Sequence, residues 1–521
     1  MKSQALFLRY SIPLTPLPGS APVWLAEVGK EDWIRIARTI RDEGGRLISV
    51  WGRHQSAAGP APDRFILSAA YCVAEGLLWL RLPVLQQDGY PDLTGLYPAA
   101  SRMQRCVFDL LGVDAVSADD ARPWLNHGRW PHDYFPLRED ASGLEQFDTA
   151  LEDYAFVPVA GEGVHEIAVG PIHAGIIEPA HFRFSVVGEK VLRLEQRAGY
   201  AHKGIGKLFT RRHLADGHLV AGRVSGDSTV AFAWSYCMAA ESAAGCDVPQ
   251  RALWLRALLL ERERIANHLG DLGAIGNDAG FAVGLAQFSR LKEDWVRLNH
   301  QLFGHRFMMD RIIPGGSAVD LDRSGSDAII AQCDAIEREV KTLQAIYEEH
   351  AGLQDRVISA GRVLPKLAAQ LGLCGQAGRA SSQARDARAD QAIAPYHQLN
   401  VQMATHHNGD VAARMLVRFE EIYESLRLLR EILQQMPPGP VAITLPDIIA
   451  AGCGIGWVEG WRGPVFVALE HDAEGKILRC HSHDPSWQNW PVLEHAIMGN
   501  IVPDFPLINK SFNLSYSGYD L

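Results

Sequence analysis

The chain has 521 residues, which exceeds what one hydrophobic core usually holds, because cores stop growing at roughly 250 to 300 residues. Hydrophobic residues make up 47% of it and charged residues 21%, a composition typical of a folded protein rather than a disordered chain. The net charge of −11 argues against nucleic acid or an acidic membrane surface as the main partner. We therefore expect one small and one large domain.

Residues 1–140 alternate between strand-like and helix-like patterns. RFILSAAYCV and LLWLRLPVL read as strands, whereas EDWIRIARTIRDEGG and ASRMQRCVFDLLG have the spacing of short amphipathic helices. This mixture predicts a small α+β domain. Residues 141–165 are acidic, contain glycine and proline and show no sustained period, so we expect a linker there.

Residues 166–521 read as a large, mainly helical bundle with a small β-sheet. Apolar residues recur every three or four positions within 254–272, 329–347 and 411–433, which predicts three long helices. Ser326 is the expected N-cap of the second, and the prolines of MPPGP should end the third. The β-branched residues and polar turns of 169–199 favour a small sheet. The fold class is therefore α+β.

Membrane-spanning segments and metal-binding cysteine pairs are both missing from the sequence pattern. The longest apolar run, ALWLRALLL, is interrupted by Arg256 and is far shorter than the roughly 20 residues that a transmembrane helix needs. The apolar run before Arg9 is too short for a secretory signal, so we expect a cytoplasmic chain. None of the eight cysteines forms a CxxC pair, which argues against an iron–sulfur cluster or zinc held by this chain alone.

Four segments contain residues suited to chemistry: GPIHAGIIEPAHF at 170–182, RVSGDS at 223–228, RASSQARDARAD at 379–390, and SFNLSYSGYDL at the C-terminus. Each is weak by itself, because a lone histidine is most often structural and an Arg/Asp cluster is usually a solvated surface. Their order and residue patterns, together with HKGIGK, LLLERERIANHLGDLG, MPPGP and IVPDFPLINKSF, resemble those of one family.

From about residue 166 onward the chain resembles the large subunit of membrane-bound, energy-converting [NiFe] hydrogenases and the homologous quinone-site subunit of respiratory complex I. YPDLTGLYPAASRMQRCVFDLLGV and WPHDYFPLRED resemble the small hydrophilic complex I subunit, often fused in this order in the hydrogenase branch. The resemblance implies partners: an iron–sulfur small subunit, other hydrophilic subunits and membrane ion-translocating subunits. It also implies a peripheral position on the inner face of the cell membrane through those partners.

The resemblance also implies a metal site that this chain has lost. In hydrogenases four cysteines of RVCGxC and DPCxxC hold nickel and iron, and matching by position places Ser225, Ser228, Ser515 and Gly518 there. An alkyl hydroxyl is a hard, normally protonated donor, and glycine has no side-chain donor. We therefore expect no nickel–iron centre and no cofactor or metal held by this chain.

The complex I relatives imply a quinone as the substrate in the same place. Their histidine of the GPxH loop, paired with an aspartate, carries over to His173 and Asp278, and the proton-carrying glutamate of hydrogenases carries over to Glu178. A carboxylate-paired imidazole is suited to protonate a reduced quinone. The complex I tyrosine is replaced by Gly226, and Tyr516 is the candidate to compensate for it.

Two readings of function follow from the resemblance, and a third concerns metals. The first is a subunit of a complex I-like or hydrogenase-like respiratory oxidoreductase that lines a quinone site and couples electron transfer to ion translocation. The second is a coupling scaffold without redox chemistry. The third is a different, hard metal ion held by Asp386, Asp390 or His173. Arg223, Arg385, Asp386 and Arg388 would either orient the cavity or satisfy its buried polar groups.

Overall fold

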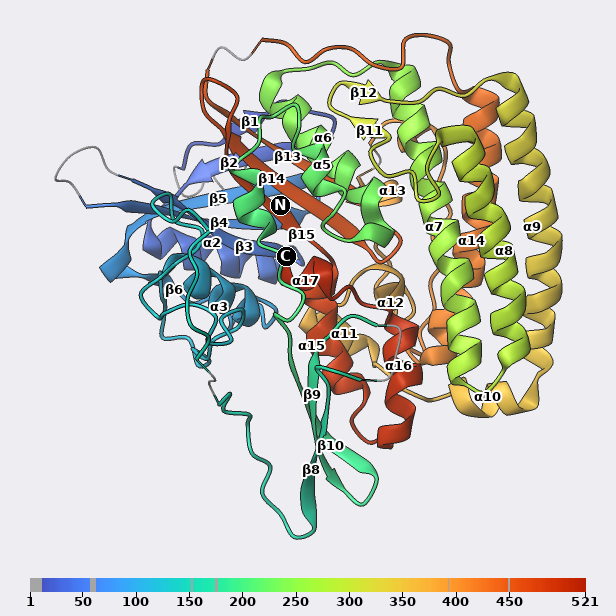
Figure 1. The fold of residues 1–521 in the computed structure, drawn as a ribbon, viewed down its shortest axis with the longest axis horizontal. Helices are drawn as coiled ribbons and strands as arrows, with labels where there is room; N and C mark the ends of the chain where they lie inside the picture. Colours follow the sequence, from blue (N-terminus) through green and yellow to red (C-terminus); the bar gives the residue numbers. More distant parts are fainter. Residues whose placement is uncertain (1–11, 57–61, 151–152, 174–176, 392, 448–449) are drawn as a thin grey trace.

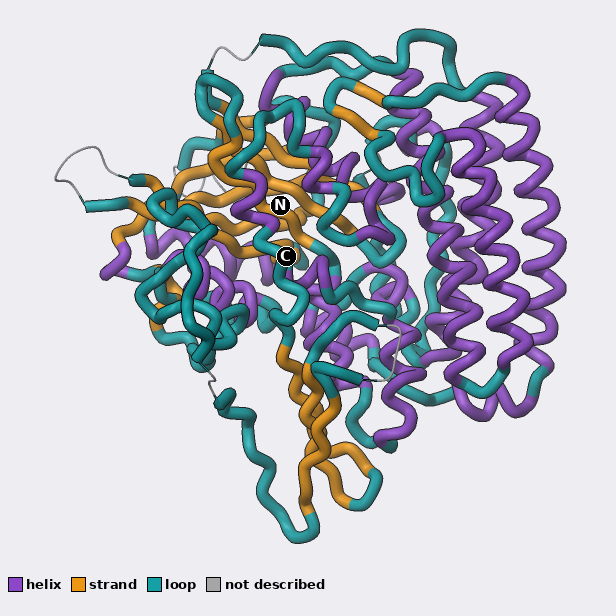
Figure 2. Tube along the Cα trace, in the orientation of Figure 1, coloured by secondary structure: helices purple, strands orange, loops and turns teal. Residues whose placement is uncertain are grey.

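The computed structural model describes residues 12–56, 62–150, 153–173, 177–391, 393–447 and 450–521. Figures 1 and 2 show a sheet-rich part on one side and a bundle of long helices on the other, with a β-hairpin projecting between them. The predicted α+β fold, with a mainly helical second part, is confirmed. The predicted division into 1–140, a linker at 141–165, and 166–521 stays a prediction.

The N-terminal unit is a five-stranded sheet in the order β1-β2-β5-β4-β3, in which β2 and β5 are parallel. Its strands are β1 (Thr15–Leu17), β2 (Val23–Glu27), β3 (Arg46–Gln55), β4 (Arg64–Val73) and β5 (Gly76–Leu85). Leu78, Leu80 and Leu82 join the large core that includes α2 (Lys30–Asp42) and α3 (Ala100–Leu111). Leu77 and Trp79 belong to a separate apolar cluster. Since successive side chains of a strand point to opposite faces, both faces of this sheet are buried.

Short elements complete the N-terminal unit and lead to a second sheet. They are η1 (Gln86–Asp88), β6 (Tyr90–Pro91) and β7 (Ala115–Val116). The three-stranded sheet that follows, in the order β10-β9-β8, consists of β8 (Val164–Val169), β9 (His181–Val187) and β10 (Lys190–Arg197). It confirms the small sheet expected at 169–199 and forms the projecting hairpin of Figure 1.

The helical unit contains the three predicted long helices and a fourth beside them. α7 (Gln250–Asp278), α9 (Arg323–Glu349) and α14 (Val411–Gln435) cover the predicted ranges, and α8 (Ala282–Phe303) packs against α7 and α9. The predicted N-cap Ser326 is wrong: the helix begins earlier, because the Asp322 carboxylate accepts the amide of Gly325 at 2.7 Å. α14 ends before Pro437, as predicted.

A sheet that the sequence analysis missed joins the two units. β13 (Gly452–Glu459), β14 (Pro464–His471) and β15 (Ile477–His483) form it, with α6 (Thr229–Ala244) against β13 and β14. Its Ile455, Trp457, Phe466 and Ala468 pack against Trp51, Trp79 and other residues of the N-terminal sheet. This apolar contact fixes the N-terminal unit on the helical one.

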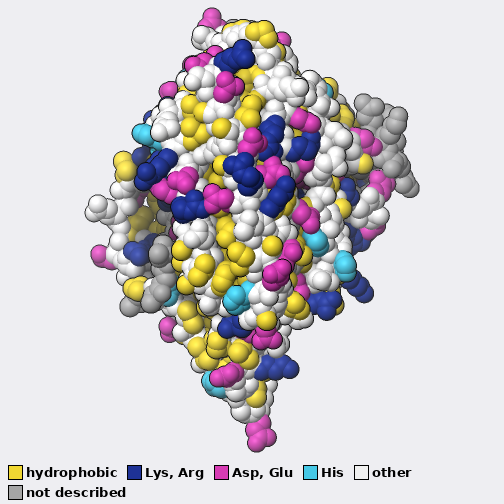
Figure 3. Space-filling view, turned by 90° about the vertical axis from the view of Figure 1, so that its right-hand side faces the viewer, with side chains coloured by type: hydrophobic (Ala, Val, Ile, Leu, Met, Phe, Trp, Pro, Cys, Tyr) yellow, Lys and Arg dark blue, Asp and Glu magenta, His cyan; other side chains and the backbone are white. Residues whose placement is uncertain are grey.

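The remaining elements are short and connect these layers. They are α4 (Ile205–Phe209), α5 (His218–Ala221), η2 (Gly226–Ser228), β11 (Ile312–Ile313), β12 (Gly316–Ser317), α10 (Ala351–Val357), α11 (Pro365–Leu371), α12 (Gly375–Arg379), α13 (Ala387–Asp390), η3 (Tyr396–Gln398), α15 (Ser486–Ala496), η4 (Val502–Asp504), α16 (Phe505–Phe512) and α17 (Ser517–Asp520). On the face shown in Figure 3, acidic and basic side chains intermingle over the middle of the bundle, where pairs such as Arg290–Glu339 join α8 to α9.

Candidate functional site

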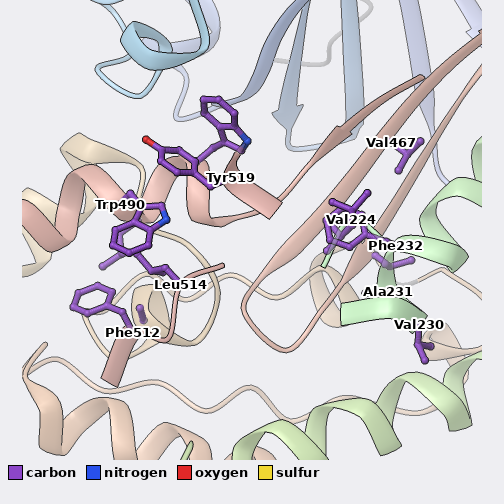
Figure 4. Packing of buried hydrophobic residues seen from close by; sticks show 14 of the residues in the cluster. Val224, Val230, Ala231, Phe232, Val467, Trp490, Phe512, Leu514 and Tyr519 are labelled. Carbon is purple, nitrogen blue, oxygen red and sulfur yellow. The ribbon is translucent and has the colours of Figure 1, made fainter. Parts of the chain in front are cut away.

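The loop that carries Ser225 and Ser228 is held in place by the helices around it. Val224, which precedes Ser225, is buried in the core, and Figure 4 shows it beside Phe232 of α6. Asn267 of α7 donates to the Asp227 carbonyl at 2.8 Å, and the indole of Trp461 donates to the same oxygen at 2.9 Å. The backbone of the loop is therefore fixed from two sides.

The C-terminal segment carrying Ser515 and Gly518 is fixed by α15. The Ser515 amide donates to the Ser486 hydroxyl at 2.9 Å, and the indole of Trp490 donates to the Ser515 carbonyl at 3.2 Å. Leu514 and Tyr519 are buried beside Trp490, as Figure 4 shows. Apolar anchoring of this kind orders a segment whose polar side chains then point to one place.

The two segments meet through their serine hydroxyls. The Oγ atoms of Ser225 and Ser515 lie 2.9 Å apart, and the Gly518 amide donates to Ser515 Oγ at 2.9 Å. Ser225 donates to the Asp227 carboxylate at 2.7 Å, and Ser228 donates to it at 3.4 Å. The four positions matched to the hydrogenase cysteines thus come together in space, and their hydroxyls bond to one another and to one carboxylate.

Arg462 closes this hydroxyl cluster. Its guanidinium donates to both carboxylate oxygens of Asp227, at 2.8 and 2.5 Å, and to Ser228 Oγ at 3.2 Å. Desolvation raises the pKa of the half-exposed Asp227 carboxyl, but the Arg462 guanidinium outweighs it and holds this pKa at about 2. The carboxylate is therefore ionised and fully engaged at neutral pH. Neither residue was among the predicted site residues, although Asp227 lies inside RVSGDS and Arg462 inside the GWRGP stretch.

The donor set and the space at these positions do not fit a thiolate-bound metal centre. Three of the four positions present hydroxyls, and all eight cysteines of the chain lie elsewhere as free thiols. A Cβ atom at Gly518 would stand 2.8 Å from the Asp484 carboxylate and 2.9 Å from Ser515 Oγ. Among the described residues, no group of three or more His, Cys, Asp or Glu side chains is placed to hold a metal ion.

An open cleft of about 490 Å³ lies beside the hydroxyl cluster. Both segments and α16 contribute to its lining, which consists of Ile177, Glu178, Ser225, Gly226, Asp227, Arg462, Lys510, Asn513, Leu514, Tyr516 and Ser517. Its volume falls in the range of small-molecule sites, and its polar groups include an ammonium, a carboxylate and several hydroxyls. The cleft is thus the candidate functional site.

Glu178 and Tyr516, two of the predicted site residues, line this cleft, and their roles stay predictions. The Glu178 carboxylate accepts from the Ser517 amide at 3.0 Å and from the Ser517 hydroxyl. Tyr516 is buried, stacks edge-on against Trp490 and accepts a hydrogen bond from Asn509 at 3.2 Å. Burial raises the pKa of the Tyr516 phenol, so this group stays neutral and is able to donate a hydrogen bond.

His173 and Asp278 are not among the residues that line the cleft, and the structure records no hydrogen bond between them. Nε2 of His173 is buried and has no partner among the described residues, whereas Ala174, Gly175 and Ile176 of the same loop lie outside them. Asp278 ends α7, where burial raises the pKa of its carboxyl and the Lys510 ammonium opposes that shift. The roles assigned to His173 and Asp278 stay predictions.

The predicted arginines and their carboxylates lie away from the cleft lining. Arg223 is half-exposed and forms an ion pair with Asp310, with N–O distances of 2.7 and 2.8 Å. Arg388 is buried and bonds to Asp386 and to Glu261 of α7. Arg388, Asp386 and Glu261 thus form a buried structural network. Both oxygens of the Asp386 carboxylate accept from Arg388, at 3.0 and 2.6 Å, which leaves this group badly placed to bind a hard metal. Arg385 borders a different cavity, between the two units.

A second titratable group close to this region is Asp520 of α17. Its carboxylate accepts from the Ala201 amide at 2.8 Å, and burial raises the pKa of the carboxyl to about 7. Glu178 and Lys203 are the charged groups that act on it across the C-terminal segment. This carboxyl is therefore able to exchange a proton near neutral pH. The sequence analysis missed it, because an aspartate beside the C-terminus carries no distinctive spacing.

Two protein families match parts of the chain. The family described as respiratory-chain NADH dehydrogenase, 49 Kd subunit, matches residues 278–452, and that of the 30 Kd subunit matches residues 26–146. Formate hydrogenlyase subunit 5 of Escherichia coli is 31% identical over 437 residues, which cover 83% of this chain and 77% of the relative. The carbon monoxide-induced hydrogenase of Rhodospirillum rubrum is 31% identical, with 67% of this chain and 97% of the relative covered.

Two further comparisons extend the likeness. A protein of the NADH-quinone oxidoreductase of Bacteroides thetaiotaomicron is 26% identical over 412 residues, covering 75% of this chain and 77% of the relative. A chain of an archaeal membrane-bound sulfane sulfur reductase shares the fold with a TM-score of 0.65 at 24% identity, over 70% of this chain and 100% of that chain. Within the part of the chain that the structure describes, no helix is both long and apolar enough to span a bilayer. The chain belongs to the family of hydrogenase large subunits represented by formate hydrogenlyase subunit 5 and hydrogenase-4 component G, which is homologous to the 49-kDa and 30-kDa subunits of respiratory-chain NADH dehydrogenase.

Proposed function

We propose that this chain is a subunit of a membrane-associated, complex I-like oxidoreductase, and that its cleft takes a quinone or a quinone-like acceptor instead of a nickel–iron centre. One observation carries the proposal: the positions matched to the metal ligands are closed by hydroxyl hydrogen bonds, while the cleft of about 490 Å³ beside them remains open. Serine hydroxyls and glycine supply no thiolate, so a soft metal has no ligands here.

Reduction of a quinone to a quinol consumes two electrons and two protons. The electrons would come from an iron–sulfur cluster in a partner subunit, since the chain has no cysteine pattern that would hold one. At the cleft, the Lys510 ammonium and the Tyr516 phenol would donate hydrogen bonds to the acceptor, and the Glu178 carboxylate next to Ser517 would pass protons to it. Nε2 of His173 is buried and without a partner among the described residues; it would donate a hydrogen bond to a quinone oxygen that reaches beyond the residues lining the cleft.

The likeness to proteins of hydrogenases and NADH-quinone oxidoreductases supports partners of the same kinds. These are an iron–sulfur subunit, further hydrophilic subunits, and membrane subunits that move ions. The chain would be peripheral on the inner face of the membrane and held there by those partners.

A scaffold without redox chemistry is the second candidate. It is favoured by the absence of His173 and Asp278 from the cleft lining and by the engagement of Asp227 with Arg462. In that case the hydroxyl cluster only fills the space of a former metal centre.

The test is quinone reduction by the complex purified from membranes, with its natural electron donor and at matched amounts of this chain. We expect Lys510→Gln and His173→Ala to lower turnover about tenfold or more, because each removes a group that binds or protonates the acceptor. Lys341→Gln, on the outer face of α9 and paired with Glu337, is the matched control and should keep full turnover. Full activity of both the Lys510 and the His173 variant would favour the scaffold.

Nickel content separates the proposal from hydrogenase chemistry. Elemental analysis of the same complex should find less than one nickel per chain. A stoichiometric nickel content, together with hydrogen evolution, would contradict it.

A further inference from the structure

A second cavity lies between the N-terminal unit and the helical unit, away from the cleft. Its volume is about 500 Å³, and its walls come from the start of β3, the 95–99 loop, the 369–374 segment and β13. It lies at the border of the apolar contact in which Trp51 and Trp79 pack against Phe466. Cavities between domains are frequent ligand sites because two surfaces contribute to them.

The charged side chains among the described residues that line this cavity are basic, and none is acidic. The described residues that line it include Arg41, Arg46 and Arg385 and contain neither aspartate nor glutamate. This is notable in a chain with a net charge of −11. Arg41 bonds to its neighbour Asp42. Arg46 of the N-terminal unit and Arg385 of the helical unit form no ion pair with a described carboxylate, and the contact of Arg46 is to Cys72 Sγ at 3.9 Å.

The free guanidinium groups contrast with the other arginines near them. Arg379 and Arg388, a few positions from Arg385, are buried and engage the carboxylates of Glu421, Glu459, Asp386 and Glu261. Those arginines stabilise the fold. Arg385 is exposed, and both Arg385 and Arg46 border this cavity and also an adjoining one of about 270 Å³, whose lining does contain carboxylates. Its side chain is therefore free for a ligand.

The walls around the arginines are preformed and partly apolar. The Gln488 side chain donates to the Ile48 carbonyl at 2.6 Å, while His481 bonds to Ser49 Oγ at 2.7 Å, so helix α15 and β15 hold β3. Leu47, Ile48, Leu371 and Trp457 contribute apolar surface. A rigid cavity of this kind binds without paying much ordering entropy.

We propose that this interdomain cavity binds a small organic anion, a carboxylate, sulfonate or phosphate on an apolar body, with its charged group between Arg46 and Arg385. Planar guanidinium groups bind such oxyanions through paired N–H donors, and the described residues that line this cavity include no carboxylate to compete with the anion. The site is separate from the cleft, so it does not depend on the proposed function.

The experiment uses the full-length chain and anilinonaphthalene sulfonate, an aromatic sulfonate whose fluorescence rises on binding. We expect one saturable site, and an affinity about tenfold lower for Arg46→Gln and for Arg385→Gln, which corresponds to the loss of one charge-assisted contact. Arg46→Lys and Arg385→Lys keep the charge and should recover part of the affinity. Arg290→Gln, which breaks the exposed pair with Glu339 on the bundle, is the matched control and should bind as the wild type does.

Neutral phenylnaphthylamine has the same aromatic rings but no sulfonate, so it separates the contribution of the anionic group from that of the rings. It should bind more weakly and show no difference between the wild type and the arginine variants. Equal binding of the sulfonate by all variants would overturn the proposal. So would binding by the free chain that disappears in the purified membrane complex, because a partner protein would then cover the cavity.

Discussion

Ser225 and Ser515 are 290 positions apart in the sequence, yet their hydroxyl oxygens lie 2.9 Å apart, at two of the positions matched to the hydrogenase cysteines. The Gly518 amide and the Asp227 carboxylate complete the contact, and Arg462 neutralises the carboxylate. These hydrogen bonds tie the two segments together. The cluster is not closed off, since Ser225, Asp227 and Arg462 also line the open cleft.

Adding a side chain at Gly518 should destabilise the chain. In Gly518→Ala the new methyl group would stand 2.8 Å from the Asp484 carboxylate, and we expect a loss of about 1 to 3 kcal/mol in the free energy of unfolding. Denaturant titration of the purified chain measures it. Gly226→Ala is the matched control, since nothing lies within 4 Å of a Cβ atom there. Equal stability of both variants would show that the C-terminal segment shifts enough to accommodate the methyl group.

The buried network around Glu261 should be costly to break. Its carboxylate accepts from Arg388, from Tyr396 at 2.6 Å and from Ser425 at 2.6 Å, all inside the bundle. Glu261→Gln leaves the Arg388 guanidinium with less compensation, so we expect a loss of about 3 to 5 kcal/mol. Thermal or denaturant unfolding checks this. Glu339→Gln on the bundle surface should change stability by less than about 1 kcal/mol, as exposed ion pairs usually do.

Glu263 should make stability depend on pH in the neutral range. Burial raises the pKa of its carboxyl from 4.5 to about 8, although the amides of Val230 and Ala231 donate to it. The folded state thus holds a proton that the unfolded state releases. Its contribution to stability is fully present below pH 4.5 and is lost as the pH rises through about 8.

Unfolding measured at several pH values tests this. The wild type should lose stability relative to Glu263→Gln between pH 4.5 and about 8, because glutamine does not titrate. Parallel curves for the two proteins would mean that the Glu263 carboxyl is ionised in the folded chain.

The contact between the two units should depend on Trp51. Its ring stacks on His481 at 4.7 Å between centroids and packs against Trp79 and Phe466. Trp51→Ala removes most of this apolar surface, and we expect a loss of about 3 to 5 kcal/mol together with faster proteolysis within 141–165. Phe108→Ala, at a partly exposed ring of α3, is the comparison and should leave the proteolysis rate unchanged.

Local patterns in the sequence were enough for the long helices. The apolar stripes of α7, α9 and α14 have helical spacing, and the end of α14 follows from the prolines just after it, whereas the start of α9 was misplaced. The types of donor at the four former ligand positions are likewise a property of the sequence alone, since a side chain's chemistry does not depend on the fold. Both were predicted for that reason.

The sheet β13–β15 could not be predicted in the same way. Its first strand is rich in glycine, which usually interrupts a strand pattern. Only the packing explains the glycines: a Cβ atom at Gly456 would stand 1.7 Å from the Ser235 carbonyl of α6, and one at Gly454 would stand 2.1 Å from the Ala239 carbonyl. The helix lies directly on the strand, a relation between segments more than 200 positions apart.

The same limit applies to the site. The sequence contains Ser225, Ser515, Asp227 and Arg462, but the bonds that join them depend on how α6, α15 and β13 pack, because hydrogen bonds act over about 3 Å and chain separation says nothing about such distances. The same packing leaves His173 and Asp278 without a hydrogen bond to each other and sets Arg46 and Arg385 around one cavity. The sequence by itself determined which side chains are present. Tertiary packing decided that they form a hydroxyl cluster, an open cleft and a cationic cavity.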